Sequence, residues 1–142
     1  MPSKTELKKL AKTRLNEAKV LYKEGFYDGA CYLAGYVIEL ALKARICKVL
    51  DLDQYPDSGD ISKSFKIHKL DDLLKLAGLQ KKFDSAKVAQ PNLFTNWSIT
   101  TKWNESFRYL PVGNSAKVST RETIEALEDK TDGVFTWITK FW

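Results

Sequence analysis

The sequence has 142 residues, 44% of them hydrophobic and 12% aromatic, which is enough chain and enough apolar content for one domain with a buried core. This composition excludes a generally disordered protein. The formal net charge of +5 permits binding to nucleic acid or to another anionic partner but does not require it. The most apolar window, residues 30–42, is too short for a membrane span and contains Glu39, so we expect no transmembrane segment.

Two cysteines, Cys31 and Cys47, fall within one predicted helix. At 1.5 Å per residue their Cα atoms would lie about 24 Å apart on that helix, whereas a disulfide needs Cα atoms within about 7 Å of each other. A disulfide within the chain is therefore excluded, and we predict a reducing, cytoplasmic setting. Both cysteines have apolar neighbours, which predicts unreactive thiols.

The first predicted helix covers residues 3–24. Ser3 with Glu6 three positions later matches a capping box, and Gly25 suits a left-handed stop. Four lysines gather on one arc beside the apolar stripe of this helix. We interpret them either as a solvent-exposed face or as a surface that neutralises phosphate groups without reading a base sequence. These lysines are Lys8, Lys12, Lys19 and Lys23.

The second predicted helix, residues 28–50, is the expected centre of the fold. It is apolar on most of its circumference, and one face is nearly all alanine, which lets a neighbouring helix approach closely. Asp28 can cap it, and the short turn before Asp28 predicts an antiparallel hairpin with the first helix. One polar stripe remains, formed by Tyr32, Tyr36, Glu39 and Lys43. We expect this stripe to face water, a ligand or a partner.

Residues 51–67 are a predicted surface loop, because their first half mixes turn-forming and acidic residues. This loop does not match a calcium-binding loop, which needs Gly at its sixth position and Glu at its twelfth. A short amphipathic helix closed by Gly78 is predicted for residues 68–77. A further helical segment is predicted for residues 79–89, stopped by Pro91.

Residues 92–110 contain strand-forming residues in a helical context, and with no second strand to pair with they are predicted to be helical or irregular. The last helix is predicted from residue 115 onward, with Ser119 and a glutamate three positions later as a second capping box and a bend at Gly133. Residues 1–142 therefore predict a single all-α domain, an up-and-down bundle of about five helices. The four tryptophans are expected to anchor the core or a dimer: Trp97, Trp103, Trp137 and Trp142.

Three stretches of the sequence, in this order, resemble the HEPN domain family of prokaryotes and higher eukaryotes. They are LYKEGFYDGACYLAGYVIELALKA, KIHKLDDLL and the aromatic segment that ends in WNESFRYLP. They are similar to the family's two long antiparallel helices, its short helix opened by His-x-Leu, and its Arg-Tyr-x-Pro element before a final long helix. The resemblance covers most of the chain. It implies an all-helical bundle that usually dimerises, sometimes paired with a nucleotidyltransferase-type protein.

The resemblance also raises the question of ribonuclease activity. Many HEPN proteins are metal-independent ribonucleases, whose site is an Arg followed after four to six residues by a His and is completed by both protomers of a dimer. Here the only histidine, His68, precedes Arg108 and Arg121, and Arg45 has no histidine at that spacing. Without this imidazole, the family's usual activation of a ribose hydroxyl is missing. We therefore predict no ribonuclease activity of the usual kind.

His68 itself is interpreted as a structural or capping residue at the start of its helix. A lone histidine would need carboxylates for every other metal ligand, at spacings that the sequence does not show, so no metal is predicted. The sequence contains no Gly-rich phosphate loop and no Ser/His/Asp order. No cofactor is therefore predicted.

Glu39 and Lys43 are four residues apart, in the order that favours a helix-surface ion pair worth about 0.2 to 0.5 kcal/mol. In the alternative interpretation they face a cleft together with Arg108. Lys43 and Arg108 would hold a phosphate there, and a tyrosine would stack on a base. The candidate ligand-binding residues are Tyr32, Tyr36, Glu39, Lys43, Arg108 and Tyr109. No catalytic residue is assigned.

Three hypotheses about function follow from these observations. In the first, a dimeric HEPN-like module binds a nucleotide, RNA or a nucleotidyltransferase-type partner and lacks ribonuclease activity. In the second, the protein is a ribonuclease or nucleotide-modifying enzyme with an unorthodox site, in which Glu39 acts as the base and nearby cations stabilise charge. In the third, it is a dimerising adaptor or an antitoxin-like protein with no ligand.

Overall fold

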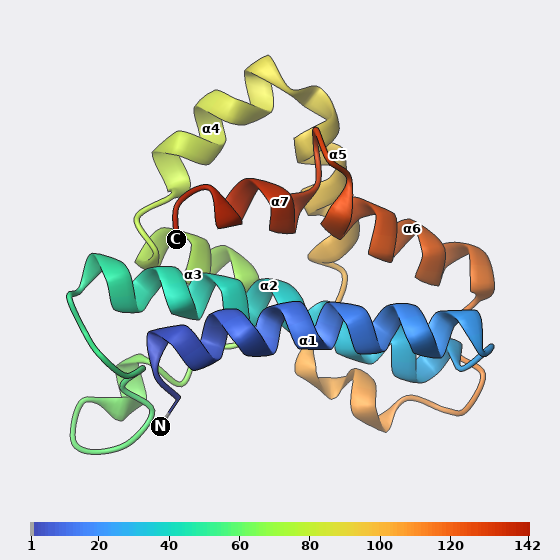
Figure 1. The fold of residues 1–142 in the computed structure, drawn as a ribbon, viewed down its shortest axis with the longest axis horizontal. Coiled ribbons are helices and arrows are strands. Elements are labelled where there is room, and N and C mark those ends of the chain that lie inside the picture. The colour runs from blue at the N-terminus through green and yellow to red at the C-terminus, as the bar shows by residue number, and fades with distance from the viewer. Residues whose placement is uncertain (1) are drawn as a thin grey trace.

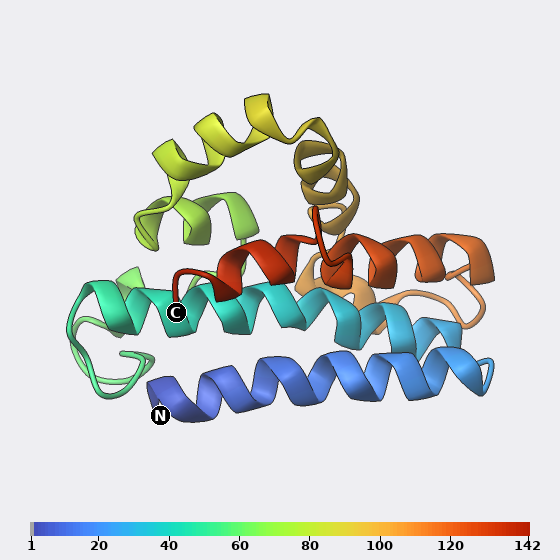
Figure 2. The ribbon, with the colours of Figure 1, turned by 45° about the horizontal axis from the view of Figure 1, so that its top comes forward.

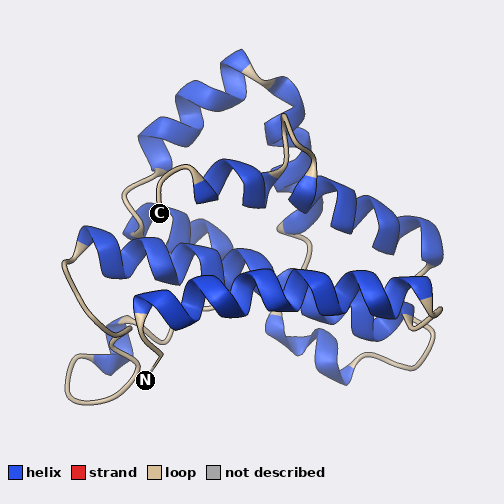
Figure 3. Cartoon of the chain, viewed as in Figure 1, coloured by secondary structure: helices blue, strands red, loops and turns tan. Residues whose placement is uncertain are grey.

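In the computed structural model, which describes residues 2–142, every regular element is a helix (Figure 3). The order is α1 (Lys4–Lys23), α2 (Tyr27–Val49), the 3-10 helix η1 (Ser62–Ser64), α3 (Leu70–Leu76), α4 (Gln80–Ala89), α5 (Pro91–Thr100), the 3-10 helix η2 (Glu105–Tyr109), α6 (Lys117–Glu128) and α7 (Val134–Thr139). The predicted all-α class is confirmed. The predicted number of about five helices is too low, because α5 is a separate helix and the last predicted helix is divided into α6 and α7.

The antiparallel hairpin of α1 and α2 runs along the length of the molecule (Figures 1 and 2). The predicted capping box at the start of α1 is present. Ser3 Oγ accepts a hydrogen bond from the Glu6 N–H at 3.2 Å, and Glu6 Oε2 accepts one from the Ser3 N–H at 2.7 Å. Gly25 follows α1 with a φ of +85°, a left-handed conformation that a residue without a Cβ adopts at no steric cost.

α2 is the central helix, as predicted. It packs against α1 on one side and contacts α3, α6 and α7 elsewhere on its circumference (Figure 2). Its alanine-rich face is completely buried, which lets the neighbouring helices approach closely. The buried residues of this face are Ala30, Ala34, Val37, Ala41 and Ala44.

Asp28 does not cap α2, so this prediction is wrong. The helix begins one residue earlier, after Phe26, which makes no side-chain cap hydrogen bond. The Asp28 carboxylate instead accepts backbone N–H groups from Ser115 at 2.8 Å and from Gly113 at 2.6 Å. These hydrogen bonds favour the ionised carboxylate and lower the pKa of Asp28. Asp28 therefore anchors the loop between η2 and α6 to the start of α2.

The connection between α2 and α3 is mostly exposed, but it contributes one aromatic side chain to the core. Tyr55 is 1% exposed, and its hydroxyl donates to the Phe65 carbonyl at 2.8 Å. The backbone on either side of Tyr55 pairs with the start of the chain. The Tyr55 N–H donates to the Pro2 carbonyl, and the Lys4 N–H donates to the Asp53 carbonyl, each at 3.0 Å. The connection is thus tied to the first turn of α1.

Of residues 92–110, predicted to be helical or irregular, residues 92–100 belong to α5, residues 101–104 lie in no helix, and residues 105–109 form η2. α4 and α5 form a corner that projects from the bundle (Figure 1). Pro91 is the first residue of α5, where a missing N–H costs nothing. Trp97 and Thr100 have strand propensity but lie buried on one face of α5, because core packing overrides local preference.

The predicted last helix is interrupted rather than bent. α6 and α7 are separated by a turn in which the Asp129 carboxylate accepts the backbone N–H groups of Thr131 and Asp132. Gly133 ends this turn, and a Cβ there would lie 2.5 Å from the Asp129 carbonyl oxygen. The second predicted capping box is also wrong. α6 starts after Ala116, and the Ser119 hydroxyl donates to the Ala116 carbonyl instead of accepting.

Three of the four tryptophans, Trp97, Trp103 and Trp137, are buried in the chain's own structure. The fourth, Trp142, is half-buried, and its Nε1 donates to the Ala41 carbonyl at 3.2 Å. Of the two predicted roles, anchoring the core or anchoring a dimer, the first thus applies to three of the four tryptophans. None of the helices within residues 2–142 is both long enough and apolar enough to cross a bilayer.

Candidate functional site

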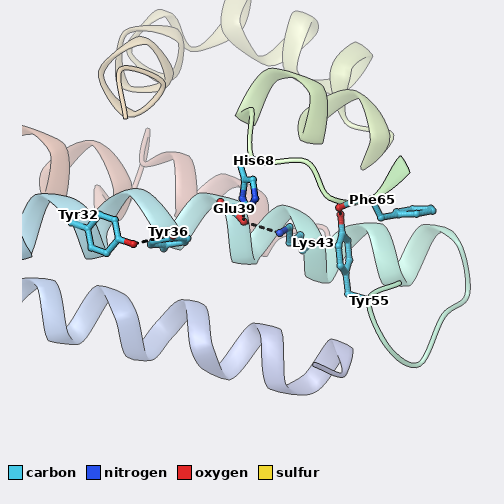
Figure 4. A network of polar contacts seen from close by, with 7 residues as sticks. All are labelled: Tyr32, Tyr36, Glu39, Lys43, Tyr55, Phe65 and His68. Carbon is cyan, nitrogen blue, oxygen red and sulfur yellow. Dashed lines mark hydrogen bonds and ion pairs between the residues drawn. The ribbon is translucent and has the colours of Figure 1, made fainter. Parts of the chain in front are cut away.

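The polar stripe of α2 begins with two tyrosines in contact. The Tyr32 hydroxyl donates to the Tyr36 hydroxyl at 3.1 Å, and the two rings meet edge to face with centroids 5.1 Å apart (Figure 4). Burial, together with this hydrogen bond, raises the pKa of Tyr36 to about 12. Tyr36 is therefore a neutral phenol at neutral pH, and it offers a ligand a hydrogen-bonding group rather than a charge.

One turn further along α2, Glu39 is the only acidic residue buried in the core of residues 2–142, with 3% of its surface exposed. Its Oε1 accepts from Lys43 Nζ at 2.7 Å and lies 3.0 Å from His68 Nδ1 (Figure 4). A buried carboxylate needs partners of this kind, because an unpaired charge in the core is strongly destabilising. The ion pair of Glu39 and Lys43 that the sequence predicts is thus part of a network of three residues, which His68 completes.

The geometry around Glu39 fixes the orientation of His68. A carboxylate can only accept, so the contact assigns the proton of the neutral ring to Nδ1 and leaves Nε2 with its lone pair. His68 is 44% exposed at its side chain, in contrast to the 4% of Glu39. The ring is therefore held from its buried side and accessible from its other side.

Lys43 is held between this network and the α2–α3 connection. Its Nζ lies 5.1 Å from the centroid of the Tyr55 ring, within the range of a cation–π contact. Burial raises the pKa of Tyr55, so this ring is also neutral. The Tyr55 contact closes the end of the stripe away from the two tyrosines (Figure 4).

The Trp103 ring packs on α2 beside Tyr32 and Tyr36. It packs directly on Gly35, where a Cβ would lie 2.1 to 2.2 Å from three ring atoms, and it meets Tyr36 with ring centroids 4.8 Å apart. Phe107 lies beside the indole as well, with ring centroids 6.5 Å apart. Gly35 is therefore a requirement of tertiary packing within a long helix.

Arg108 and Tyr109 lie on η2, at the surface beside the tyrosines. The guanidinium stands 4.9 Å from the centroid of the Tyr109 ring, and Tyr109 is 77% exposed. The neighbouring Tyr109 side chain, followed by that of Tyr32, raises the pKa of Arg108, and a guanidinium is charged at any physiological pH. The structure thus brings Arg108 to Tyr32, as the cleft interpretation expects.

The six candidate residues form two groups rather than one. Arg108 and Tyr109 join the tyrosine end of the stripe, whereas Glu39 and Lys43 join His68. Within residues 2–142, no hydrogen bond or ion pair connects Arg108 to Glu39 or to Lys43. A phosphate held jointly by Lys43 and Arg108 is therefore not what this arrangement favours.

A cleft opens beside His68, between the segment that precedes α3 and the segment that follows α5. It encloses about 440 Å³, within the range of about 300 to 1,000 Å³ that is typical of small-molecule sites. Residues 66–71 form one wall and residues 101, 103, 104 and 105 the other. His68 and Trp103 thus face a cavity that the sequence interpretation did not include.

The four lysines of α1 have different surroundings. Lys8 and Lys12 stand over the Trp142 ring at 5.5 and 5.7 Å, and Lys19 pairs with Glu128 at 2.9 Å. Lys23, at the end of α1, is exposed. Burial lowers the pKa of Lys8, and the positive charges of neighbouring lysines lower this pKa further. Part of the lysine row therefore also packs against the rest of the fold.

The sequence predicts a structural or capping role for His68 and a core or dimer contact for Trp103, and the structure places both at the cleft. The partner of His68 is 29 positions away, and no local pattern reveals such a contact. A glycine at position 35, inside a strongly helical segment, is the one signal that points to a close contact there.

No group of three or more His, Cys, Asp or Glu side chains in the described chain is arranged to hold a metal ion. Cys31 and Cys47 are free thiols, and burial raises the pKa of both.

Comparison with known proteins agrees with the all-helical architecture. The family model for the HEPN domain matches residues 5–141, nearly the whole chain. No curated protein and no solved structure gives a significant match.

Proposed function

The chain belongs to the HEPN domain family, and from that premise we propose that it binds a nucleotide or a short RNA where η2 meets α2, without the family's usual ribonuclease activity. The observation that carries this proposal is the exposed Arg108 guanidinium, which stands over the Tyr109 ring with Tyr32 nearby. A cation with free donors beside exposed aromatic rings suits a ligand that has both a phosphate and a base.

The two side chains at η2 would have distinct roles. Arg108 presents a planar fork of donors that matches two phosphate oxygens. In a short RNA, Tyr109 offers an exposed ring on which the base of an adjacent nucleotide can stack, a contact worth about 1 to 3 kcal/mol per base. Tyr32 lies near the guanidinium, and its partner Tyr36 adds a neutral hydrogen-bonding group on α2. The missing histidine of the family's catalytic motif favours binding over cleavage.

We further propose that the protein acts in the cytoplasm as a dimer, with a second copy or with a nucleotidyltransferase-type protein. Exposed apolar side chains support a protein contact at one end of the molecule. Phe26, at the α1–α2 turn, and Val112, in the loop after η2, line the same shallow hollow. Light scattering measures the oligomeric state, and copurification from the native host identifies a heterologous partner.

Binding of a fluorescent oligonucleotide and of ATP, at low and at moderate salt, tests the nucleotide proposal. We expect the wild type to bind, Arg108→Ala to bind at least tenfold more weakly, and Arg14→Ala to behave as the wild type. Arg14 is a suitable control because its guanidinium already pairs with Glu17 at 2.8 Å on α1. If neither ligand binds to the wild type, the nucleotide proposal is wrong and a ligand-free adaptor or antitoxin-like role remains.

A second candidate function is acid–base catalysis on a nucleotide or RNA, and the contact between Glu39 and His68 favours it. A carboxylate on Nδ1 leaves Nε2 as a proton acceptor, the arrangement that orients histidine bases in many enzymes. Labelled RNA incubated with the wild type, His68→Ala and Arg108→Ala tests this candidate. Cleavage that disappears with His68→Ala would support it. RNA left intact by the wild type would count against it.

A further inference from the structure

The cleft beside His68 has a lining that suits a planar polar ligand. Ile67, Leu70 and the Trp103 ring supply apolar surface, while ammonium and carboxylate groups stand around them. On one wall are the cations Lys66 and Lys69. Such a combination of apolar walls and convergent polar groups is typical of a specific small-molecule site.

Both signs of charge occur in this lining, which argues against a site for a bare phosphate. Glu105 and Asp71 are the two carboxylates. One Asp71 oxygen already accepts from Trp97 Nε1 at 3.2 Å, whereas the Glu105 carboxylate has no hydrogen-bond or ion-pair partner within residues 2–142. The free carboxylate is therefore available to a ligand with two adjacent N–H donors.

We propose that this cleft is the base subsite of the nucleotide-binding site and that it prefers guanine, with Glu105 as the specificity-determining residue. The inference rests on the proposed function, because it assigns the base of the nucleotide whose phosphate Arg108 holds. Guanine presents two neighbouring donors, N1–H and the N2 amino group, which match one carboxylate. Its O6 and N7 are acceptors that match the ammonium groups of Lys66 or Lys69.

The other bases fit this lining less well. Adenine places an acceptor, N1, beside its amino group, so a carboxylate meets one donor and one repelling lone pair. Cytosine has the same defect at N3, and uracil has a single donor between two carbonyl acceptors. Hypoxanthine keeps N1–H and O6 but lacks the amino group, which makes it the intermediate case.

The geometry of η2 connects this subsite to Arg108. Glu105 and Arg108 are three residues apart on a 3-10 helix, where side chains at that spacing eclipse one another. At about 2 Å of rise per residue, their Cα atoms are offset by about 6 Å along the helix axis. One short helix thus carries a carboxylate that lines the cleft and an exposed cation one turn away, at a separation that a single nucleotide spans.

The experiment is calorimetric titration of the whole protein with GMP, IMP, AMP and CMP. We expect GMP to bind about tenfold more tightly than AMP or CMP, with IMP between them. Glu105→Gln should weaken GMP binding about tenfold and remove the preference over AMP, while leaving AMP binding nearly unchanged. Glu24→Gln removes the same charge at the exposed end of α1 and serves as the matched control.

The possible results separate this inference from the function on which it rests. Equal binding of the four nucleotides to the wild type would overturn the base subsite while nucleotide binding stands. A preference for GMP that survives Glu105→Gln would overturn the role of Glu105. No binding of any nucleotide would overturn the proposed function as well. A circular dichroism spectrum like that of the wild type excludes misfolding as the cause of the Glu105→Gln effect.

Discussion

Replacing Gly35 with Ala tests the packing that holds η2 and the cleft against α2. The new Cβ would lie 2.1 Å from the Cγ and Cδ2 atoms of Trp103, far inside van der Waals contact. Trp103 is 5% exposed and packs on Tyr36, so a shift of its ring away from α2 disrupts this aromatic contact. We expect the substitution to displace the indole from α2.

The size of the effect follows from two opposed contributions. Losing the packing of a buried Trp side chain costs about 3 to 5 kcal/mol, the range for truncation of a large aromatic residue in a core. Ala in the interior of a helix is about 1 kcal/mol more favourable than Gly. The free energy of unfolding should therefore fall by about 2 to 4 kcal/mol in Gly35→Ala.

Urea unfolding followed by far-UV circular dichroism measures this loss without relying on tryptophan fluorescence. Gly29→Ala is the matched control on the same helix, because its Cβ would meet only the end of the Leu21 side chain at 3.3 Å. In a Trp103→Ala background, Gly35→Ala should change sign and stabilise the protein by up to about 1 kcal/mol. Equal stability of Gly35→Ala and Gly29→Ala would refute the reasoning.

Three further predictions concern other parts of the fold. The backbone hydrogen bonds to Asp28 lower its pKa, so their stabilising effect is complete above the unfolded-state pKa of about 3.9 and is lost as the pH falls through the lower folded-state pKa. Amide chemical shifts of the loop before α6 should report this titration, and the same titration in Asp28→Asn would contradict it. Ser3→Ala should lower the free energy of unfolding by about 1 kcal/mol, whereas Ser119→Ala, which removes no cap, should change it by less than about 0.5 kcal/mol; equal losses would contradict the cap assignment. Four Lys→Glu changes on α1 should weaken RNA binding and flatten its log–log salt dependence by about 0.7 per lost phosphate contact, and an unchanged slope would exclude a binding role for Lys8, Lys12, Lys19 and Lys23.

Local rules account for the part of the fold that the sequence predicts. The capping box at Ser3, the stop at Gly25 and the apolar periodicity of α2 each depend on residues a few positions apart, and each is confirmed. The two wrong caps show the limit of the same rules. Asp28 and Ser119 have the right residue type in the right place, but the backbone groups that they contact were not known from the sequence.

The candidate site is less predictable because its contacts join distant parts of the chain. The polar stripe of α2 is visible as a pattern, whereas the contact of Glu39 with His68 spans 29 positions. The contact between Gly35 and Trp103 depends on where α5 ends and η2 begins, and residues 92–110 are the segment with the least decisive local preference. Tertiary packing decides these contacts, and helical periodicity carries no information about them.

The backbone hydrogen bonds between the start of α1 and the α2–α3 connection have a consequence for the placement of affinity tags. The Pro2 carbonyl holds the backbone of Tyr55, and the Tyr55 ring lies beneath Lys43, which pairs with Glu39. An affinity tag or a fusion partner placed directly before Pro2 would disturb the backbone contact with Tyr55, and through it the contacts of Lys43 and Glu39. A flexible spacer, or proteolytic removal of the tag before any binding measurement, avoids mistaking the effect of a tag for a property of the site.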